Sequence, residues 1–195
     1  MKTELIKLKE NISLNVAEDT QYVLDFGKFA PEGKYELELV FNTPGVSSEI
    51  IGLYKLSKNQ TLNLTTIANH QAPNTSCMTH IKGVLEDKTT SDYVGKILID
   101  KKAQQTSSYL ADAVLVVGED THNNSQPILE IEADDVKASH GATTGRINRD
   151  HIYYLESRGF SETEAKGILV EAFFESLLSK IEDEKIKQEV KKTLK

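Results

Sequence analysis

Two short motifs in this chain of 195 residues carry side chains that could do chemistry. Asp134 and Asp135 form an acidic pair, and two carboxylates are what glycosidic hydrolysis requires. Ser139–Gly141 contains His140, whose imidazole can bind a metal or move a proton near neutral pH. Adjacent residues of a strand point to opposite faces, so the two carboxylates cannot act on one substrate. We interpret Asp134 and Asp135 as turn and interface residues. His140 fits a structural role at a corner of a sheet as well as it fits a functional site.

The single cysteine, Cys77, begins a Cys-x-x-His spacing that ends at His80, and His70 lies nearby in the sequence. One thiol and two imidazoles fall short of a closed zinc site, which needs four ligands. We therefore predict that Cys77 is a small buried hydrophobic residue. The chain also has no Gly-Lys-Ser/Thr phosphate loop.

Composition narrows the classes of protein. The net charge of −7 argues against nucleic acid as a partner, because phosphates would repel the chain. No apolar run has the length of a signal peptide or a membrane span. One cysteine excludes an internal disulfide and fits a reducing compartment, so we expect a cytoplasmic protein.

The elements that must position these residues change type along the chain. From about Ile12 to Ser139 short apolar–polar alternations recur between turn-prone pieces, with no amphipathic helix between them. The predicted strands are Tyr35–Phe41, Glu49–Lys55, Thr61–Ile67, Met78–Leu85, Tyr93–Ile99, Val114–Val117 and Ile128–Ile131. By pattern alone, a sandwich and a solenoid are equally acceptable.

After Gly145 the period changes from two to about 3.6, which predicts helices. We expect a β domain over 1–146 and a helical segment over 147–195. Asn148 is a suitable N-cap, Ser161–Glu164 is a capping box, and 183–194 is a third short helix. These helices could cap the open end of a solenoid or form a docking surface for a partner.

The run from Pro127 to Gly145, PILEIEADDVKASHGATTG, closely resembles the core motif of the SufB/SufD family of SUF iron–sulfur cluster assembly scaffolds. Similarity continues at 69–73, 82–85, 95–97 and 103–106, and Gly141 follows the SufD pattern. The resemblance implies a mainly β fold, a right-handed parallel β-helix with a C-terminal α-helical unit. It also implies a minimal form without the family's N-terminal helical region.

The resemblance implies a scaffold that is not an enzyme, which pairs with a SufB-like subunit or with itself and docks a SufC-like ATPase. The implied subunit interface contains Asp134, Asp135, Ser139, His140 and Gly141. The implied ATPase surface comprises Tyr154, Leu155, Arg158, Ile168, Leu169, Ala172, Phe173 and Phe174.

Ala138 stands where the family has a cysteine. The isolated chain should therefore bind no cofactor, and an iron–sulfur cluster could reach His140 only in a complex. Two other functions stay open: a carbohydrate-active or ligand-binding solenoid that uses the acidic pair, and a self-pairing structural β-helix without cluster chemistry.

Overall fold

A computed structural model of the chain describes residues 1–8, 11–26 and 32–194. Over this part, eleven strands precede three helices, so the change of type near Gly145 is confirmed. The strands are β1 (Lys2–Lys7), β2 (Asn11–Asn15), β3 (Thr20–Asp25), β4 (Glu32–Phe41), β5 (Ser47–Leu56), β6 (Thr61–His70), β7 (Ser76–Leu85), β8 (Thr90–Ile99), β9 (Ser107–Val116), β10 (His122–Ile131) and β11 (Lys137–Arg146). The helices are α1 (Arg149–Ser157), α2 (Glu162–Leu178) and α3 (Glu184–Thr193).

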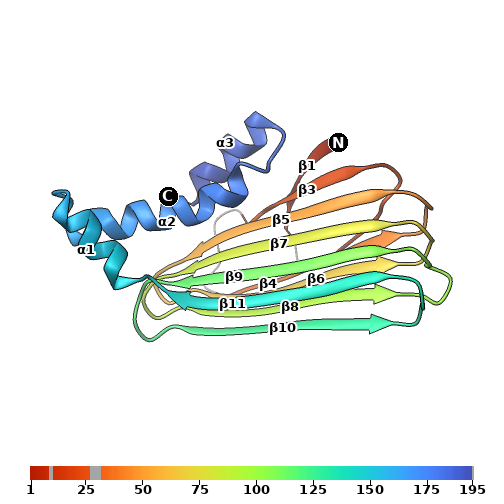
Figure 1. The fold of residues 1–195 in the computed structure, drawn as a ribbon, viewed down its shortest axis with the longest axis horizontal. Helices are drawn as coiled ribbons and strands as arrows, with labels where there is room; N and C mark the ends of the chain where they lie inside the picture. Colours follow the sequence, from red (N-terminus) through yellow and green to blue (C-terminus); the bar gives the residue numbers. More distant parts are fainter. Residues whose placement is uncertain (9–10, 27–31, 195) are drawn as a thin grey trace.

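The strands form a parallel β-helix, which confirms the predicted solenoid and excludes an antiparallel sandwich (Figure 1). Odd-numbered strands build a six-stranded sheet in the order β1-β3-β5-β7-β9-β11. Even-numbered strands build a five-stranded sheet in the order β10-β8-β6-β4-β2. Each coil of the chain thus adds one strand to each sheet, in parallel register with the coil before it.

Alternation along each strand sends one set of side chains into the lumen between the sheets. In β6, the buried residues Leu62, Leu64 and Ala68 alternate with half-buried neighbours. Matching positions of the other strands complete one continuous apolar core. Left-handed backbone at residues such as Asn74 (φ 59°) and Asp120 (φ 53°) reverses the chain in the turns, a conformation that Asn and Asp tolerate well.

The β-helix is longer at both ends than the predicted range of Ile12 to Ser139. It begins at β1 and continues through β11 to Arg146. The sequence of β11, KASHGATTGR, is poor in large apolar residues, so its period-two signal is weak. Only its hydrogen bonding to β9 makes it a strand.

Local signals at the helix ends are confirmed. The Asn148 side chain accepts a hydrogen bond from the Asp150 amide and caps α1. Ser161 and Glu164 form the capping box that begins α2. Gly159 has a left-handed φ of 96° just after α1, where a side chain would be strained. None of the described helices is long and apolar enough to cross a bilayer.

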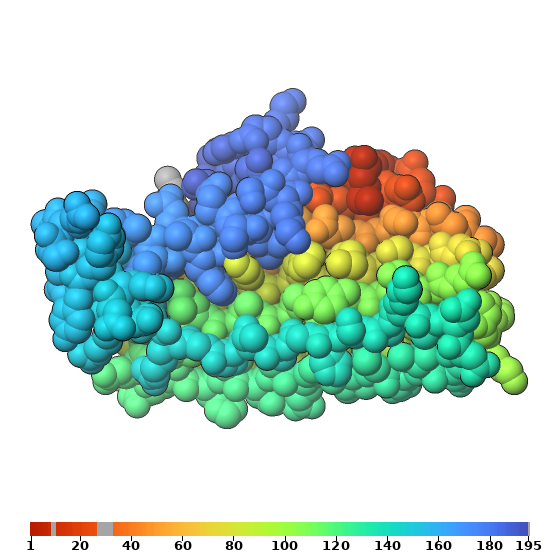
Figure 2. Space-filling view, viewed as in Figure 1, coloured from red at the N-terminus to blue at the C-terminus, as the bar shows by residue number. Residues whose placement is uncertain are grey.

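The helices do not cap an end of the solenoid, so that expectation is wrong. Helices α2 and α3 turn back across the outer face of the six-stranded sheet, as Figures 1 and 2 show. A second apolar cluster joins Phe174, Leu177 and Leu178 to the outward-facing residues Val23 and Ile51. Outward-facing apolar residues on β3, β5 and β7 offer the helices more burial than a polar edge would.

Candidate functional site at the open end of the β-helix

The last coil, β10 and β11, is an open end. Strand β10 pairs only with β8, and strand β11 pairs only with β9, within the described chain. The outer edges of β10 and β11 therefore carry backbone N–H and C=O groups without a neighbouring strand. A strand of another chain can pair with such an edge. Figure 2 shows α2 and α3 over the earlier strands of the sheet, with the row of β11 uncovered below them.

His140 lies inside β11 and not beyond the β-helix, whose predicted end was Ser139. It pairs in register with Leu110, a buried residue of the lumen. The imidazole is therefore on the lumen side of the sheet, yet it is exposed because no further coil covers it. This arrangement presents the ring to anything that docks on the open end.

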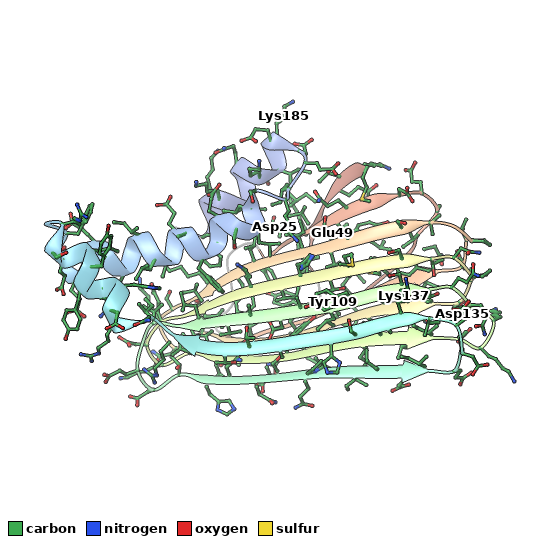
Figure 3. All side chains as sticks on the ribbon, viewed as in Figure 1. Asp25, Glu49, Tyr109, Asp135, Lys137 and Lys185 are labelled. Atoms are coloured by element: carbon green, nitrogen blue, oxygen red, sulfur yellow. The ribbon has the colours of Figure 1, made fainter. Side chains whose placement is uncertain are left out.

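Ser139 and Gly141 occupy the alternate positions and face outward. Gly141 pairs with Ala111, and a Cβ built on it would lie 3.4 Å from the Tyr109 hydroxyl, which is ordinary contact. Tyr109 lies on the outer face of β9 beside β11 (Figure 3). The glycine and His140 therefore lie on opposite faces of the sheet.

The acidic pair lies in the turn between β10 and β11, not in a strand. Asp135 is at the corner farthest from α1 (Figure 3), where its amide donates to Gln104 Oε1 at 2.9 Å. Its carbonyl accepts from the Gln105 amide at 2.6 Å. Both carboxylates are exposed to solvent. This agrees with a turn and edge role for Asp134 and Asp135.

The thiol and the two histidines considered as metal ligands do not converge on one site, because Cys77 and His70 face the lumen and His80 faces outward. Cys77 is buried in the lumen, and burial raises the pKa of its thiol to about 12. His80 is three residues further on and faces outward, 3.7 Å from Glu49. His70 is fully buried between Thr75 Oγ1 (2.8 Å) and Ser108 Oγ (3.2 Å).

No group of three or more His, Cys, Asp or Glu side chains is arranged to hold a metal in the described part of the chain. Ala138, which replaces the family cysteine, pairs with Ser108 at the start of β11. Since the only cysteine is an inert buried thiol, a metal or cluster at His140 would need sulfur ligands from elsewhere.

A polar group in the lumen was missed by sequence reasoning. Asp112 of β9 is 2% exposed and shares the inward parity of Leu110 and Val114. The alternation in SSYLADAVLV could have revealed an acid on the buried face. We attached no role to it, because one acid within a strand is a weak signal without the neighbours that the fold supplies.

The residues assigned to an ATPase surface divide into three groups. Tyr154, Arg158, Ile168 and Ala172 are exposed; Leu155, Leu169 and Phe173 are half-buried; and Phe174 is 3% exposed. Phe174 therefore has little surface left for a partner, because its ring packs on the β-helix.

The exposed members lie near other apolar side chains. Tyr153 is 61% exposed, Tyr154 59%, Phe160 42% and Ile168 37%, so two successive helices carry large apolar groups in solvent. The Arg158 guanidinium lies over the Tyr154 ring, 5.2 Å from its centroid. Large apolar side chains in solvent are typical of protein-binding surfaces where they form one patch.

Comparison with known proteins gives one consistent result. Residues 8–173 match a family model described as the SufBD core domain of SUF system FeS cluster assembly. SufD of Escherichia coli is 34% identical over 133 residues, which are 68% of this chain and 31% of that protein. An iron–sulfur cluster assembly SufBD family protein of Mycobacterium leprae is 34% identical over 149 residues, 72% of this chain and 38% of that protein.

SufD of Bacillus subtilis is 30% identical over 131 residues, 67% of this chain and 30% of that protein. The chain thus spans about a third of the length of these curated relatives.

Proposed function

The chain belongs to the SufBD core family of the SUF system for iron–sulfur cluster assembly, and from this premise we propose that it is a SufD-like scaffold subunit without enzymatic activity. The relatives named SufD support this choice within the family. In this role the chain binds other components of the system and presents a surface on which a cluster is held or passed.

The observation that carries the proposal is the open coil with His140 in it. Edge strands that no helix covers would be prone to aggregation if they stayed free. Pairing with a SufB-like subunit, or with a second copy, would continue the sheets and bury Ile131, which is 40% exposed at the end of β10.

The imidazole of His140 is then enclosed at the junction of two subunits. An imidazole can ligate iron, and clusters are otherwise held mainly by cysteine thiolates. Because Cys77 is buried and Ala138 has no thiol, the sulfur ligands must come from the partner. The cluster is cargo in this scheme, and this chain contributes one nitrogen ligand or orients a partner's thiolate.

The second contact is with a SufC-like ATPase. The exposed apolar surface of Tyr154 and Ile168, together with Arg158, supports docking there, because it projects from helices that the β-helix already anchors through Phe174. The ATPase would supply ATP turnover, for which this chain has no phosphate loop.

Co-expression with SufB-like and SufC-like subunits tests the pairing and the cluster role together. We expect the chain to co-purify with the SufB-like subunit and the complex to gain iron and sulfide on reconstitution, while the isolated chain stays colourless. His140→Ala should lower the cluster content of the complex without loss of pairing. His122→Ala is the matched control, because His122 is an exposed histidine on the other strand of the same coil.

Equal cluster content in the wild type and His140→Ala would reduce His140 to a structural residue. A stable homodimer that gains no cluster with any partner would instead favour the self-pairing structural protein.

A pulldown tests the ATPase surface: Tyr154→Ala with Ile168→Ala should weaken SufC binding, whereas Met78→Ala should not. Met78 is 38% exposed on β7 and serves as a control for loss of exposed apolar surface. Unchanged binding by the double variant would refute this surface.

A further inference from the structure

The lumen beneath the open coil contains a set of hydrogen-bond acceptors that the chain itself leaves unpaired. Both carboxylate oxygens of Asp112, the Ser125 hydroxyl and the Asn123 amide oxygen are buried and lack a partner among the described residues. Buried polar groups are nearly always paired, so four such atoms from three residues in one layer require an explanation.

These residues converge through the register of the last coil. Asp112 pairs in register with Ala142 of β11. The small methyl group of Ala142 therefore lies between the carboxylate and the open end. Ser125 and Asn123 occupy inward positions of β10, in register with the buried residues Tyr93 and Ser91. The Asn123 Nδ2 group donates to Thr144 Oγ1 at 2.8 Å across the lumen, which orients the amide oxygen away from that bond.

Asn123 lines a hollow at the surface, whereas Asp112 and Ser125 lie deeper in the lumen. A hollow of about 280 Å³ is lined by Asn123 and Thr144 at the mouth of the lumen, together with Val116, Thr121, Gly145 and Arg146. Arg146, four residues after Ala142 on the same strand, forms no hydrogen bond with either Asp112 oxygen.

Asp112 lacks a compensating positive charge. Burial raises the pKa of its carboxyl to about 6, and the nearby Ser125 hydroxyl acts in the opposite direction although it falls short of hydrogen-bond geometry. No lysine or arginine contributes to this shift. The carboxyl is nonetheless mostly ionised above neutral pH, so it carries a negative charge in an apolar lumen.

The ligand that fits is a single, compact positive charge with several N–H donors. One carboxylate with neutral amide and hydroxyl oxygens provides too few charged ligands for tight binding of a divalent cation. A lysine ammonium carries one charge and three donors on a long flexible stem, which matches three acceptor residues that lie below the open coil.

We propose that Asp112, Ser125 and Asn123 form a receptor for a lysine side chain of the subunit that pairs with the open coil. The inference rests on the pairing proposed above and adds to it a chemical determinant of partner choice. A partner with such a lysine neutralises the buried charge, whereas one with an acid or a leucine there leaves it unpaired.

Binding of a small ammonium ion tests the receptor without any partner. n-Butylammonium chloride at about 0.1 M should raise the thermal midpoint of the isolated wild-type chain by about 2 °C relative to tetramethylammonium chloride, which has no N–H donor. Asp112→Asn should abolish this difference. An equal response of both proteins, or no response of the wild type, would overturn the receptor.

Pairing provides the second measurement. Asp112→Asn should weaken the complex with the SufB-like subunit, or the homodimer, by at least about tenfold. Glu130→Gln is the matched control, because it removes one exposed charge from the same coil and should change affinity less than about twofold. The isolated Asp112→Asn chain should unfold at a urea concentration no lower than the wild type does, which excludes misfolding as the cause.

A pairing affinity unchanged by Asp112→Asn would refute the inference. If the wild type pairs with nothing, the proposed scaffold function fails, and the ammonium measurement alone decides whether the receptor exists.

Discussion

Two buried groups of the β-helix lumen, His70 and Asp112, should make the free energy of unfolding change in opposite directions as the pH falls. Protonation should destabilise the fold through His70 and stabilise it through Asp112. His70 is 0% exposed, stacks on Phe41 with ring centroids 4.4 Å apart, and is held by two hydroxyl groups. Burial lowers the pKa of its imidazole to about 4, against 6.5 for an unperturbed histidine. The unfolded chain therefore takes up a proton that the folded chain refuses.

The stability that neutral His70 confers is complete above pH 6.5 and is lost as the pH falls toward 4. From these two pKa values the loss between pH 7.5 and pH 5 is about 2 kcal/mol. Asp112 changes stability in the other direction, since burial raises the pKa of its carboxyl from 3.8 to about 6. As the pH falls, the folded chain takes up this proton at a higher pH than the unfolded chain does. The free energy of unfolding therefore gains about 1 kcal/mol between pH 7.5 and pH 5.

Two variants separate these contributions. His70→Asn removes the titrating imidazole and keeps a polar side chain, so its loss of unfolding free energy from pH 7.5 to pH 5 should be about 2 kcal/mol smaller than that of the wild type. Asp112→Asn removes the compensating group, so its loss should be about 1 kcal/mol larger. Urea denaturation followed by far-UV circular dichroism at both pH values measures each difference.

Comparison between variants cancels the titration of exposed carboxylates, which all three proteins share. Parallel pH dependence in the wild type, His70→Asn and Asp112→Asn would refute the reasoning. It would mean that water reaches these groups in the isolated chain and that the lumen does not exclude it.

Three further predictions concern packing. Phe174→Ala should lower the free energy of unfolding by about 3–5 kcal/mol because the ring is buried between α2 and the β-helix, whereas Ile168→Ala on the exposed side should cost less than about 1 kcal/mol in the same urea titration. Gly83→Ala should destabilise by at least about 1–3 kcal/mol, since its Cβ would lie 2.2 Å from the Tyr54 ring; an unchanged thermal midpoint would contradict that packing. Gly167→Ala, whose Cβ meets nothing within 4 Å in α2, should instead raise stability by about 0.5–1 kcal/mol, seen as a higher thermal midpoint.

Some of the features on which the proposed complex and its lysine receptor depend could be predicted from the sequence, and others could not. The strand at Tyr35–Phe41 and the capping box at Ser161 were predicted correctly, because alternation and capping depend on residues within a few positions of one another. The choice of a solenoid over a sandwich needed the family resemblance, since both folds show the same alternation.

The sequence by itself determined the order and type of most elements, the helix starts, and membership of a cluster assembly family through the 127–145 motif. Only the tertiary structure decided that β11 is a strand and that His140 faces the lumen, because both follow from its register with β9, about thirty residues earlier. It also decided that Phe174 is buried while the adjacent Phe173 is half-buried. Neighbouring helix residues differ by about 100° in direction, and only the sheet on which the helix packs selects the buried one.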